Sequence, residues 1–499
     1  MNEADQARRK VIKNLLIAGF GIHLIGCTSA SPTKEKSIPS HEKPEIDTLK
    51  VEQIVDEVLS TNVTYFIKED EEFVELATYF NLETQKDPGI IALVVNEEGV
   101  SEAILHAKEL NLPVSIKSGG HSFEQFSSNN GGLVINLSLL NTIEWSDAEH
   151  IKAGPACLLK ETYDFTLPEG RILPAGSCGS VGLGGLTLGG GYGLFARAYG
   201  LTCDQLVSAT FVDGNGEIHH LGPENEILWA LKGGGNGNFG VVTSLTLKTH
   251  PAPTEFSTTK FKAYKLDSMR AKELLQTWFE VAHNLPNDCF SAFVLNGRSL
   301  TILVTYFRAK SDGLVAMEEA LSPICDKTTT SFTKDIPKAL KRYYGIQYPI
   351  YFKNASAGYY SEFSEIDGCI DDVLSTVVTT PGLIYQINTL GGAINSQTFD
   401  RKSCYPHREY YYLSELQSYW NEGQDKQRTM LLTAFKKIQS LFYENGNRAQ
   451  YRNYPSIEFS DWESSYYGSN YKRLQSFKDR LDPENTIRHE QSVKLVKEG

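Results

Sequence analysis

Clustered glycine is the feature of this sequence that most limits how it can fold. Nine of the eighteen residues from Gly176 to Gly193 are glycine, and so are five of the eight from Gly233 to Gly240. Glycine has no Cβ atom, so it allows backbone dihedrals and close approaches that other residues do not. The two clusters therefore predict backbone that presses against another backbone or against a ligand.

The composition excludes several classes of protein. Of the 499 residues, 41% are hydrophobic and 22% are charged, as in globular proteins with a substantial core. The net charge of −13 argues against binding to the phosphate backbone of a nucleic acid. Eight cysteines are too few for a disulfide scaffold in a chain of this length, and their spacing does not pair them. We also predict no metal site.

The N-terminus predicts export. Arg8, Arg9, Lys10 and Lys13 precede the apolar stretch Asn14–Gly26, which is too short to span a bilayer comfortably. A positive head, a short apolar stretch and small residues are typical of a secretory signal. The basic run also resembles a twin-arginine signal, the route by which folded proteins are exported.

The residues around Cys27 predict how the exported chain is attached to the membrane. Leu24–Cys27 resembles a lipobox, in which Cys27 becomes the first residue and carries a lipid. We expect a signal peptide over residues 1–26 and a solvated tether, rich in Ser, Pro, Lys and Glu, over residues 27–46. The protein would then lie outside the cytoplasm with only its lipid in the membrane. A signal-anchor helix is the alternative.

Hydrophobic spacing in the body of the chain predicts a mixture of helices and strands. Before residue 252 we expect a helix over Glu97–Leu110 and strands over Pro88–Asn96, Leu112–Lys117, Leu133–Leu137, Leu206–Asp213 and Val241–Thr249. From about residue 254, strand patterns such as Leu300–Phe307 mix with helical ones such as Ser268–Asn284 and Asp425–Gln439. This favours a second α+β domain.

The glycine clusters suggest a dinucleotide-binding turn, but their context does not fit one. After Gly182 and Gly184, the third glycine of the G-x-G-x-x-G pattern is replaced by Thr187. Residues 235–240 match the pattern, yet a predicted strand follows them where the pattern requires a helix. The sequence therefore argues against a Rossmann fold.

Several motifs appear in a fixed order along the chain. The first is Ser118-Gly-Gly-His121-Ser, whose glycines let the backbone turn and offer N–H groups to a phosphate. Next come Ala175-Gly-Ser-Cys178 within the large glycine cluster, and then Gly189–Gly193. Tyr451-Arg-Asn-Tyr454 and Glu490-Gln-Ser492 lie near the end.

From about Pro88 to Val493, this ordered set resembles the berberine-bridge-enzyme-like flavoprotein oxidases, a branch of the vanillyl-alcohol-oxidase superfamily. The resemblance implies an α+β fold. We expect a two-subdomain PCMH-type FAD-binding domain over residues 47–252 and a substrate domain with an antiparallel sheet over residues 253–447. A C-terminal segment, residues 448–496, would return to the FAD domain.

The resemblance implies a bicovalent FAD cofactor. The family bonds the flavin 8α-methyl group to the histidine that is His121 here, and some members bond flavin C6 to the cysteine that is Cys178 here. A thiolate is a competent nucleophile toward an electron-poor ring. Further FAD contacts are expected from Ser118, Gly119, Gly120, Ser122, Gly176, Ser177, Gly182, Gly185, Gly190, Gly191, Tyr192, Gly193, Gly240, Val242, Asn453 and Gln491.

Catalytic groups are also implied by the resemblance. The first candidate for the base is Tyr454 and the second is Tyr451; either tyrosine needs its pKa lowered to act. A second catalytic group should lie on the strand that follows Pro406-His-Arg408. Counting residues from this motif as in the family leads to about Leu413, so Tyr411 and Glu415 on either side of it are the candidates. The chain departs from the family at Leu186, where many members have histidine, and at Ser456, where many have aspartate.

These features predict an exported FAD-dependent oxidase. It would transfer a hydride to flavin N5 from a carbon that bears a hydroxyl group, most simply in a sugar or oligosaccharide, and molecular oxygen would then yield hydrogen peroxide. The alternatives are an oxidase of a non-sugar alcohol or amine, a dehydrogenase with another electron acceptor, and an inactive flavin-binding surface protein.

Overall fold

The structure is a computed structural model of the chain, and it describes residues 60–308 and 310–496. The predicted signal peptide, the tether and Cys27 lie outside the described residues. Within the described ranges, no helix combines the length and the apolar character needed to cross a membrane. The strands of these ranges form a four-stranded, a five-stranded, a two-stranded and a seven-stranded sheet.

The four-stranded sheet lies at the start of the described chain. Its order is β1-β2-β4-β3, with β1 (Val63–Phe66), β2 (Ile90–Val94), β4 (Leu133–Asn136) and β3 (Val114–Lys117). Strand β2 is buried along its whole length, and it pairs in parallel with β4, as β3 does. Helix α4 (Glu97–Glu109) connects β2 to β3 and begins at Asn96, whose side chain accepts a hydrogen bond from the Gly99 amide.

The five-stranded sheet completes the N-terminal region, residues 60–251. Its order is β5-β6-β10-β8-β9, all antiparallel, with β5 (Ile143–Trp145), β6 (His150–Ala153), β10 (Gly240–Lys248), β8 (Leu206–Asp213) and β9 (Ile218–Leu221). The remaining elements of the region are α3 (Phe73–Leu76), α5 (Leu159–Thr166), η1 (Leu167–Glu169), β7 (Arg171–Ile172), α6 (Leu183–Leu188), α7 (Ala196–Tyr199), η2 (Thr202–Gln205), α8 (Glu226–Gly234) and β11 (His250–Pro251).

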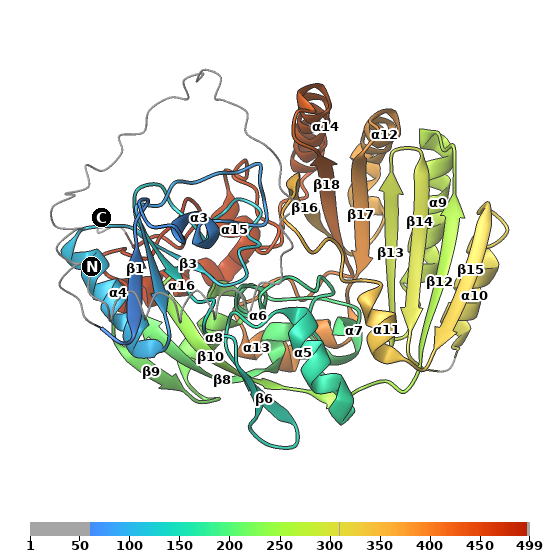
Figure 1. Cartoon of the computed structure of the whole chain (residues 1–499). Coiled ribbons are helices and arrows are strands. Elements are labelled where there is room, and N and C mark those ends of the chain that lie inside the picture. Colours follow the sequence, from blue (N-terminus) through green and yellow to red (C-terminus); the bar gives the residue numbers. More distant parts are fainter. Residues whose placement is uncertain (1–59, 309, 497–499) are drawn as a thin grey trace.

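The seven-stranded sheet is antiparallel and stands beside the N-terminal region (Figure 1). Its order is β15-β12-β14-β13-β17-β18-β16, with β15 (Lys327–Thr333), β12 (Phe256–Ala263), β14 (Ser299–Tyr306), β13 (Cys289–Asn296), β17 (Leu383–Thr389), β18 (Tyr412–Trp420) and β16 (Tyr351–Tyr360). The helices in this part of the chain are α9 (Ser268–Ala282), α10 (Asp312–Leu321), α11 (Ile336–Lys341), α12 (Ser364–Thr379), η3 (Gly392–Asn395), α13 (Gln397–Lys402) and α14 (Asp425–Glu444).

The two faces of this sheet differ because side chains alternate along each strand. Phe261, Ile302 and Leu295 are fully buried on the face that is covered by helices, among them α9, α12 and α14. On the opposite face, Val294 and Thr301 remain partly accessible. The sheet therefore presents one open face, as half-buried antiparallel sheets commonly do.

The C-terminal segment returns to the N-terminal region. Figure 1 shows α15 (Trp462–Tyr467) and α16 (Tyr471–Leu481) among the first strands and helices; η4 (Gly468–Asn470) joins them. The backbone of Ile487 bridges Val114 of β3 in parallel. The ammonium group of Lys478 donates to the carbonyls of Asn238 and Ile487 and to the carboxylate of Asp482, and both charged side chains are fully buried.

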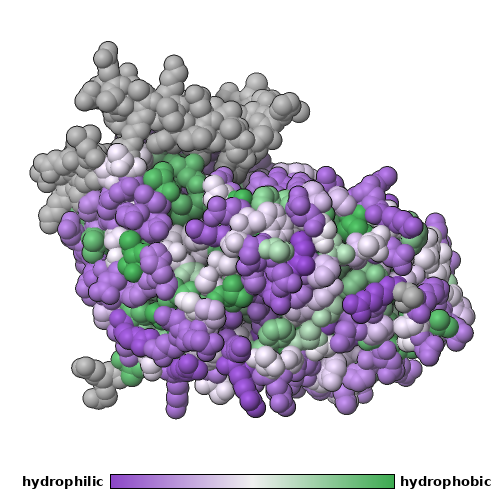
Figure 2. Space-filling model, turned by 90° about the horizontal axis from the view of Figure 1, so that it is seen from below, coloured by the Kyte–Doolittle hydropathy of each residue, from purple (hydrophilic) through white to green (hydrophobic). Residues whose placement is uncertain are grey.

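The expected helices and strands of the body agree with the structure to within a few residues. Helix α4 and strands β2, β8 and β10 fall where hydrophobic spacing predicts them. Strand β10 also follows the Gly233–Gly240 cluster directly, which confirms that no dinucleotide-type helix begins there. On the face of the molecule seen in Figure 2, hydrophobic residues lie in small separate patches among hydrophilic ones, as on most water-covered protein surfaces.

Candidate active site

The two glycine-bearing loops predicted to hold the flavin lie against each other. A Cβ atom on Gly119 would lie 2.4 Å from the backbone nitrogen of Gly182, and a Cβ atom on Gly182 would lie 2.5 Å from that of Gly119. Neither position has room for a side chain unless the backbone moves. The packing thus requires glycine at both positions and joins the loop of His121 to the loop of Cys178.

His121 is held between an aromatic ring and the second loop. Its imidazole stacks on Phe80, with 3.9 Å between ring centroids and 23° between planes. Burial lowers the pKa of His121 to about 3, against an opposing hydrogen bond with the backbone of Ser180. The ring is therefore neutral at physiological pH, which leaves one nitrogen with a free lone pair for bond formation.

The thiol of Cys178 is accessible although protein surrounds it. The residue is exposed, yet burial, and secondarily the charge of Glu415, raises the pKa of Cys178 to about 11. These two observations agree if the thiol lines a recess that a small molecule can enter. Gly185, seven residues further along, is also exposed, and a Cβ atom there would meet nothing within 4 Å.

Unpartnered polar atoms near these loops fit a cofactor with phosphate and ribose groups. The hydroxyls of Ser127, Ser128 and Ser138 and the side-chain oxygen of Asn236 are buried without a hydrogen-bond partner. Buried polar groups in native proteins nearly always have partners. Ser127 and Ser128 follow the Ser118–Ser122 motif closely, so the donor set of this region suits FAD.

Several residues predicted to contact FAD also make contacts within the protein, and their FAD contacts stay a prediction. The amide of Gln491 donates to the carbonyl of Ser456 and accepts from the hydroxyl of Tyr466. Val242 lies in the hydrophobic core, and a Cβ atom on Gly240 would lie 2.2 Å from the ring of Phe211. Sheet packing is therefore enough to explain these positions.

The remaining predicted contacts lie on or beside the glycine loops. Asn453 donates to the carbonyl of Leu186 and accepts from Asn236. Gly190 and Gly191 have φ values of 125° and 83°, which favour glycine, and the Gly191 amide donates to the hydroxyl of Tyr451. The other contacts predicted in these loops are Gly120, Ser122, Gly176, Ser177 and Gly193, and Ser118 donates to the carbonyl of Pro155.

Tyr454 belongs to a cluster of hydroxyl and carboxyl groups in which Tyr192 and Tyr454 are partly buried and Glu415 is buried. Its hydroxyl lies 2.7 Å from that of Tyr192, and its ring stacks on Phe123. Burial and then the charge of Glu415 raise the pKa of Tyr454 well above 10. Tyr454 therefore stays protonated at neutral pH, which makes it a donor and not, as the sequence suggested, the first candidate for a base.

Glu415 is the group in this cluster that titrates near neutral pH. Its side chain is buried in β18, and burial raises the pKa of Glu415 to about 8, although hydrogen bonds from Gln417 and Tyr454 lower it. A carboxyl group with such a pKa can accept a proton from a substrate and release it again. The charge of Glu415 also raises the pKa of Cys178. The open face of the sheet and the loop of Cys178 therefore interact electrostatically.

A chain of polar side chains extends from this cluster along the open face of the sheet. Gln417 donates to Glu415 at 3.0 Å and to Gln386 at 3.2 Å. Gln386 donates to Asn388, and Asn388 donates to the hydroxyl of Tyr192 at 3.1 Å. The sequence analysis missed Gln386, Asn388 and Gln417, although polar residues at every second position of two strands are a signal for such a face.

The other catalytic candidates, Tyr451 and Tyr411, take no part in these hydrogen bonds, although the ring of Tyr451 packs edge-on against the rings of Tyr192 and Tyr454. Tyr451 is buried, and burial raises its pKa, so it is no better base than Tyr454. Tyr411 is partly exposed, and its ring packs beside His283, 4.7 Å between centroids. Tyr411 precedes Glu415 by four residues, about 13 Å of extended strand, so the structure does not bring it to the cluster.

Arg452 does not supply positive charge to Tyr454. Its guanidinium donates to the hydroxyl of Tyr467 and to the ring of His489. Arg452 therefore does not lower the pKa of Tyr454.

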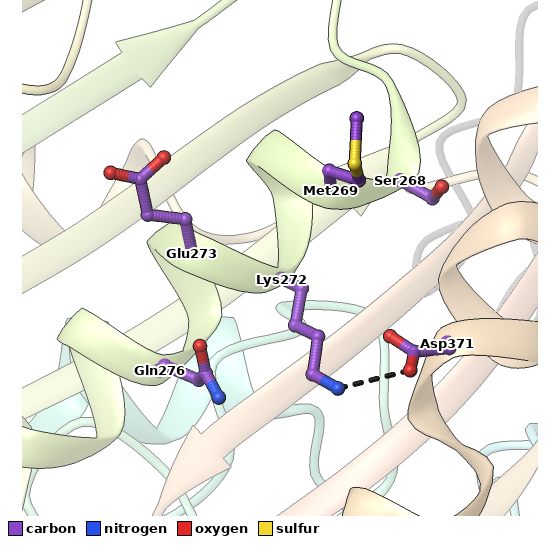
Figure 3. A pocket seen from close by; sticks show the side chains of 6 residues that line it. All are labelled: Ser268, Met269, Lys272, Glu273, Gln276 and Asp371. Atoms are coloured by element: carbon purple, nitrogen blue, oxygen red, sulfur yellow. Dashed lines mark hydrogen bonds and ion pairs between the residues drawn. The ribbon is translucent and has the colours of Figure 1, made fainter.

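A surface pocket of about 350 Å³ lies elsewhere, beside α9 (Figure 3). Its lining residues are Ser268, Met269, Lys272, Glu273, Gln276 and Asp371. Lys272 is neutralised by Asp367 and Asp371 on α12, at 3.1 Å and 3.0 Å. This side of the sheet is the one that helices cover, so the pocket is separate from the open face.

Two family models match the chain. The first is described as "FAD binding domain" and matches residues 88–222; the second is described as "Berberine and berberine like" and matches residues 450–494. The first span contains His121 and Cys178, and the second contains Tyr451 and Tyr454.

Known proteins are similar over most of the chain. An uncharacterized FAD-linked oxidoreductase of Bacillus subtilis, YgaK, is 30% identical over 443 residues, which are 85% of this chain and 95% of that protein. A chitooligosaccharide oxidase structure aligns with a TM-score of 0.78 and 23% identity, covering 87% of this chain and 97% of that one.

A third similar structure is the glucooligosaccharide oxidase of Acremonium strictum. It aligns with a TM-score of 0.77 and 22% identity, over 87% of this chain and 97% of that one. That oxidase carries a 6-S-cysteinyl, 8α-N1-histidyl FAD. At such identities the two oxidase structures establish the fold alone.

Proposed function

Because the chain belongs to the berberine-bridge-enzyme-like FAD-linked oxidoreductases, we propose that it is an exported oxidase that acts on hydroxyl-bearing carbons of sugars or oligosaccharides. The observation that carries this proposal is Glu415, a buried carboxyl group with a pKa near 8 that faces both Tyr454 and the loop of Cys178. A solvent-exposed carboxyl group would instead keep a pKa of about 4.

FAD in this protein is bicovalent, held by His121 and Cys178. Their loops touch at Gly119 and Gly182, the imidazole is neutral, and the thiol is accessible. The similar glucooligosaccharide oxidase, which carries a 6-S-cysteinyl, 8α-N1-histidyl FAD, supports this assignment. When bound, the flavin would supply the hydride acceptor, and molecular oxygen would take up the electrons.

Glu415 acts as the general base. Its ionised form takes the proton from the substrate hydroxyl as the C–H bond breaks. Tyr454 and Tyr192, both protonated because burial raises their pKa values, donate hydrogen bonds to the substrate oxygen or to Glu415. The proton and the hydride thus leave the same C–OH group in different directions, and a carbonyl or lactone is the product.

The polar side chains of the open face suit a carbohydrate. Gln386, Asn388 and Gln417 offer amide donors and acceptors, which match the hydroxyl groups of a sugar ring. A purely apolar wall would be expected for a flat aromatic substrate. The similar chitooligosaccharide and glucooligosaccharide oxidases support the same class of substrate.

Export and a lipid anchor on Cys27 remain part of the proposal. They rest on the basic head, the short apolar stretch and the lipobox-like residues of the sequence. Metabolic labelling with a radioactive fatty acid tests them: labelling that disappears in Cys27→Ala supports the anchor, and an unlabelled wild-type protein contradicts it.

A substrate panel scored by flavin reduction without oxygen tests the activity. We expect neutral and acidic oligosaccharides to bleach the flavin, and hydrogen peroxide to form in equal amount when air is admitted. Reduced flavin that persists in air without peroxide would instead identify a dehydrogenase. Bleaching by amines or alkaloids but by no sugar would identify an oxidase of another substrate, and no bleaching at all would contradict any oxidase.

A further inference from the structure

The open face of the seven-stranded sheet carries a row of side chains that starts at the catalytic cluster. Glu415 of β18 pairs with Gln386 of β17, and Gln386 pairs with Val294 of β13. Neighbouring strands are about 4.8 Å apart. Each step along the row therefore advances about as far as one pyranose ring adds to a β-1,4-linked chain.

The same row continues to the far edge of the sheet and ends in positive charge. Val294 pairs with Thr301 of β14, Thr301 pairs with Lys262 of β12, and Lys262 pairs with Lys327 of β15. Four strand spacings separate Glu415 from Lys262, about 19 Å. The neighbouring row ends similarly, because Leu303 pairs with Lys260 of β12.

The floor of this row is accessible along its length. Glu415 is buried, Gln386, Val294, Thr301 and Lys262 are partly exposed, and Lys327 is exposed. Val294 and Thr301 are short side chains, so they leave space above the middle of the sheet. The row therefore opens gradually from the cluster toward the lysines.

The lysines lack partners within the protein. Among the residues that the structure describes, no carboxylate forms an ion pair with Lys260, Lys262 or Lys327. Asp326, which precedes Lys327, already pairs with Arg270 at 3.2 Å. Lys262 and Lys327 also face each other directly, and like charges in that position destabilise a sheet.

Protection of the sheet edge does not explain this charge. A lysine on an edge strand prevents unwanted pairing with other chains, and Lys327 lies on such a strand. Lys260 and Lys262, however, lie on β12, which has a neighbour on both sides. In a chain with a net charge of −13, an unpaired cluster of lysines on an open face suits an anionic ligand.

We propose that this face binds an anionic oligosaccharide, whose reacting end lies at Glu415 and whose carboxylate or sulfate group lies at Lys262 and Lys327. The proposal rests on the proposed oxidation of oligosaccharides and specifies which of them the groove prefers. The anionic group belongs on about the fifth sugar from the reacting end, four strand spacings away from Glu415.

Two probes that differ in a single group test the proposal. They are cellopentaose and the same pentasaccharide with its non-reducing residue oxidised to glucuronate. Calorimetric titration of the flavin-loaded full chain with each probe reports the contribution of the carboxylate to binding, and oxygen uptake with each reports turnover. We expect the glucuronate probe to have a dissociation constant about fivefold lower at low salt, as for exposed ion pairs, and the advantage to shrink as salt rises.

Variants assign this preference to the lysines. In Lys262→Gln/Lys327→Gln the ratio of the two dissociation constants should approach one. Lys437→Gln removes an exposed lysine from α14, on the helix-covered side of the sheet, and should keep the wild-type ratio. Equal affinity of the wild type for both probes, or a preference that survives in the double variant, overturns the inference. Absence of turnover with both probes, in contrast, contradicts the proposed function, whatever the affinities.

Discussion

At the scale of single residues, Glu415 determines the proposed chemistry because burial raises its pKa to about 8, close to neutral pH. Its pKa of about 8 means that the base is ionised only above that pH. The rest of the cluster, Tyr192 and Tyr454, holds its protons more tightly than free tyrosine does. One acceptor among donors is the arrangement that general base catalysis needs.

The first prediction concerns this proton. The rate constant for flavin reduction divided by KM should rise with pH through about 8 in the wild type, since the ionised carboxylate is the active form. Glu415→Gln should lower that rate by about 10²- to 10⁴-fold and remove the inflection. Stopped-flow reduction without oxygen measures both, and an inflection that persists in Glu415→Gln would assign the base elsewhere.

The same shift has a consequence for stability. A carboxyl group whose pKa rises from 4.5 to about 8 on folding is stabilising while protonated, so its contribution is complete below pH 4.5 and is lost as pH rises through 8. The melting temperature of Glu415→Gln should therefore rise relative to that of the wild type as the pH increases from about 4.5 to 8, and the difference should level off above 8.

The second prediction concerns the two bonds to the flavin. Denatured Cys178→Ala should stay yellow with an altered spectrum, because His121 still holds the cofactor, and His121→Ala should stay yellow through Cys178. The double variant should lose its colour on denaturation. Cys325→Ala, at a free cysteine far along the sequence from both loops, is the control. A wild-type spectrum in Cys178→Ala would refute the thioether.

At the scale of elements, the sequence predicted the site residues of the loops better than the contacts that form between paired strands. His121 and Cys178 lie in short glycine-bearing motifs that the sequence displays directly, although the contact that requires glycine at positions 119 and 182 joins two separate loops. Gln386 and Gln417 meet only because β17 and β18 pair at a register fixed by long-range packing. Tyr411 looked equivalent to Glu415 in the sequence, and only the position of β18 separates them.

The third prediction concerns the glycine loop. Gly185 lies in helix α6, and the methyl group added by Gly185→Ala would meet no atom within 4 Å. Because alanine has a higher helix propensity than glycine, the substitution should stabilise the flavin-free protein by up to about 1 kcal/mol. If the flavin lies over this exposed position, the same change should reduce the ratio of flavin to protein absorbance. Gly222→Ala, equally free of contacts but in the loop after β9, should leave that ratio unchanged. Full flavin content in Gly185→Ala would remove this position from the site.

At the scale of the whole molecule, the buried ion pair of Lys478 and Asp482 joins the C-terminal segment to the N-terminal region. Both side chains are fully buried, and Lys478 also binds the carbonyl of Asn238. Removing one partner of such a pair leaves the other charge uncompensated, which typically costs about 3–5 kcal/mol. The sequence did not reveal this pair, because an i, i+4 spacing looks the same on any solvated helix.

The fourth prediction follows from this pair. Lys478→Met should lower the melting temperature strongly, whereas Lys478→Met/Asp482→Leu should recover part of the loss because no buried charge remains. Lys472→Met, on the exposed side of the same helix, is the control. Differential scanning calorimetry measures all three, and an equal loss in the double variant would show that packing rather than charge is responsible.

The return of the chain end also sets the order of folding. Lys478 and Val493 bond to Asn238 across 240 and 255 residues of sequence. Contacts of such long range slow folding, and these form only once almost the whole chain has left the ribosome. The N-terminal region thus completes its packing after synthesis, so even short truncations at the carboxyl end should impair flavin loading rather than merely trim a tail.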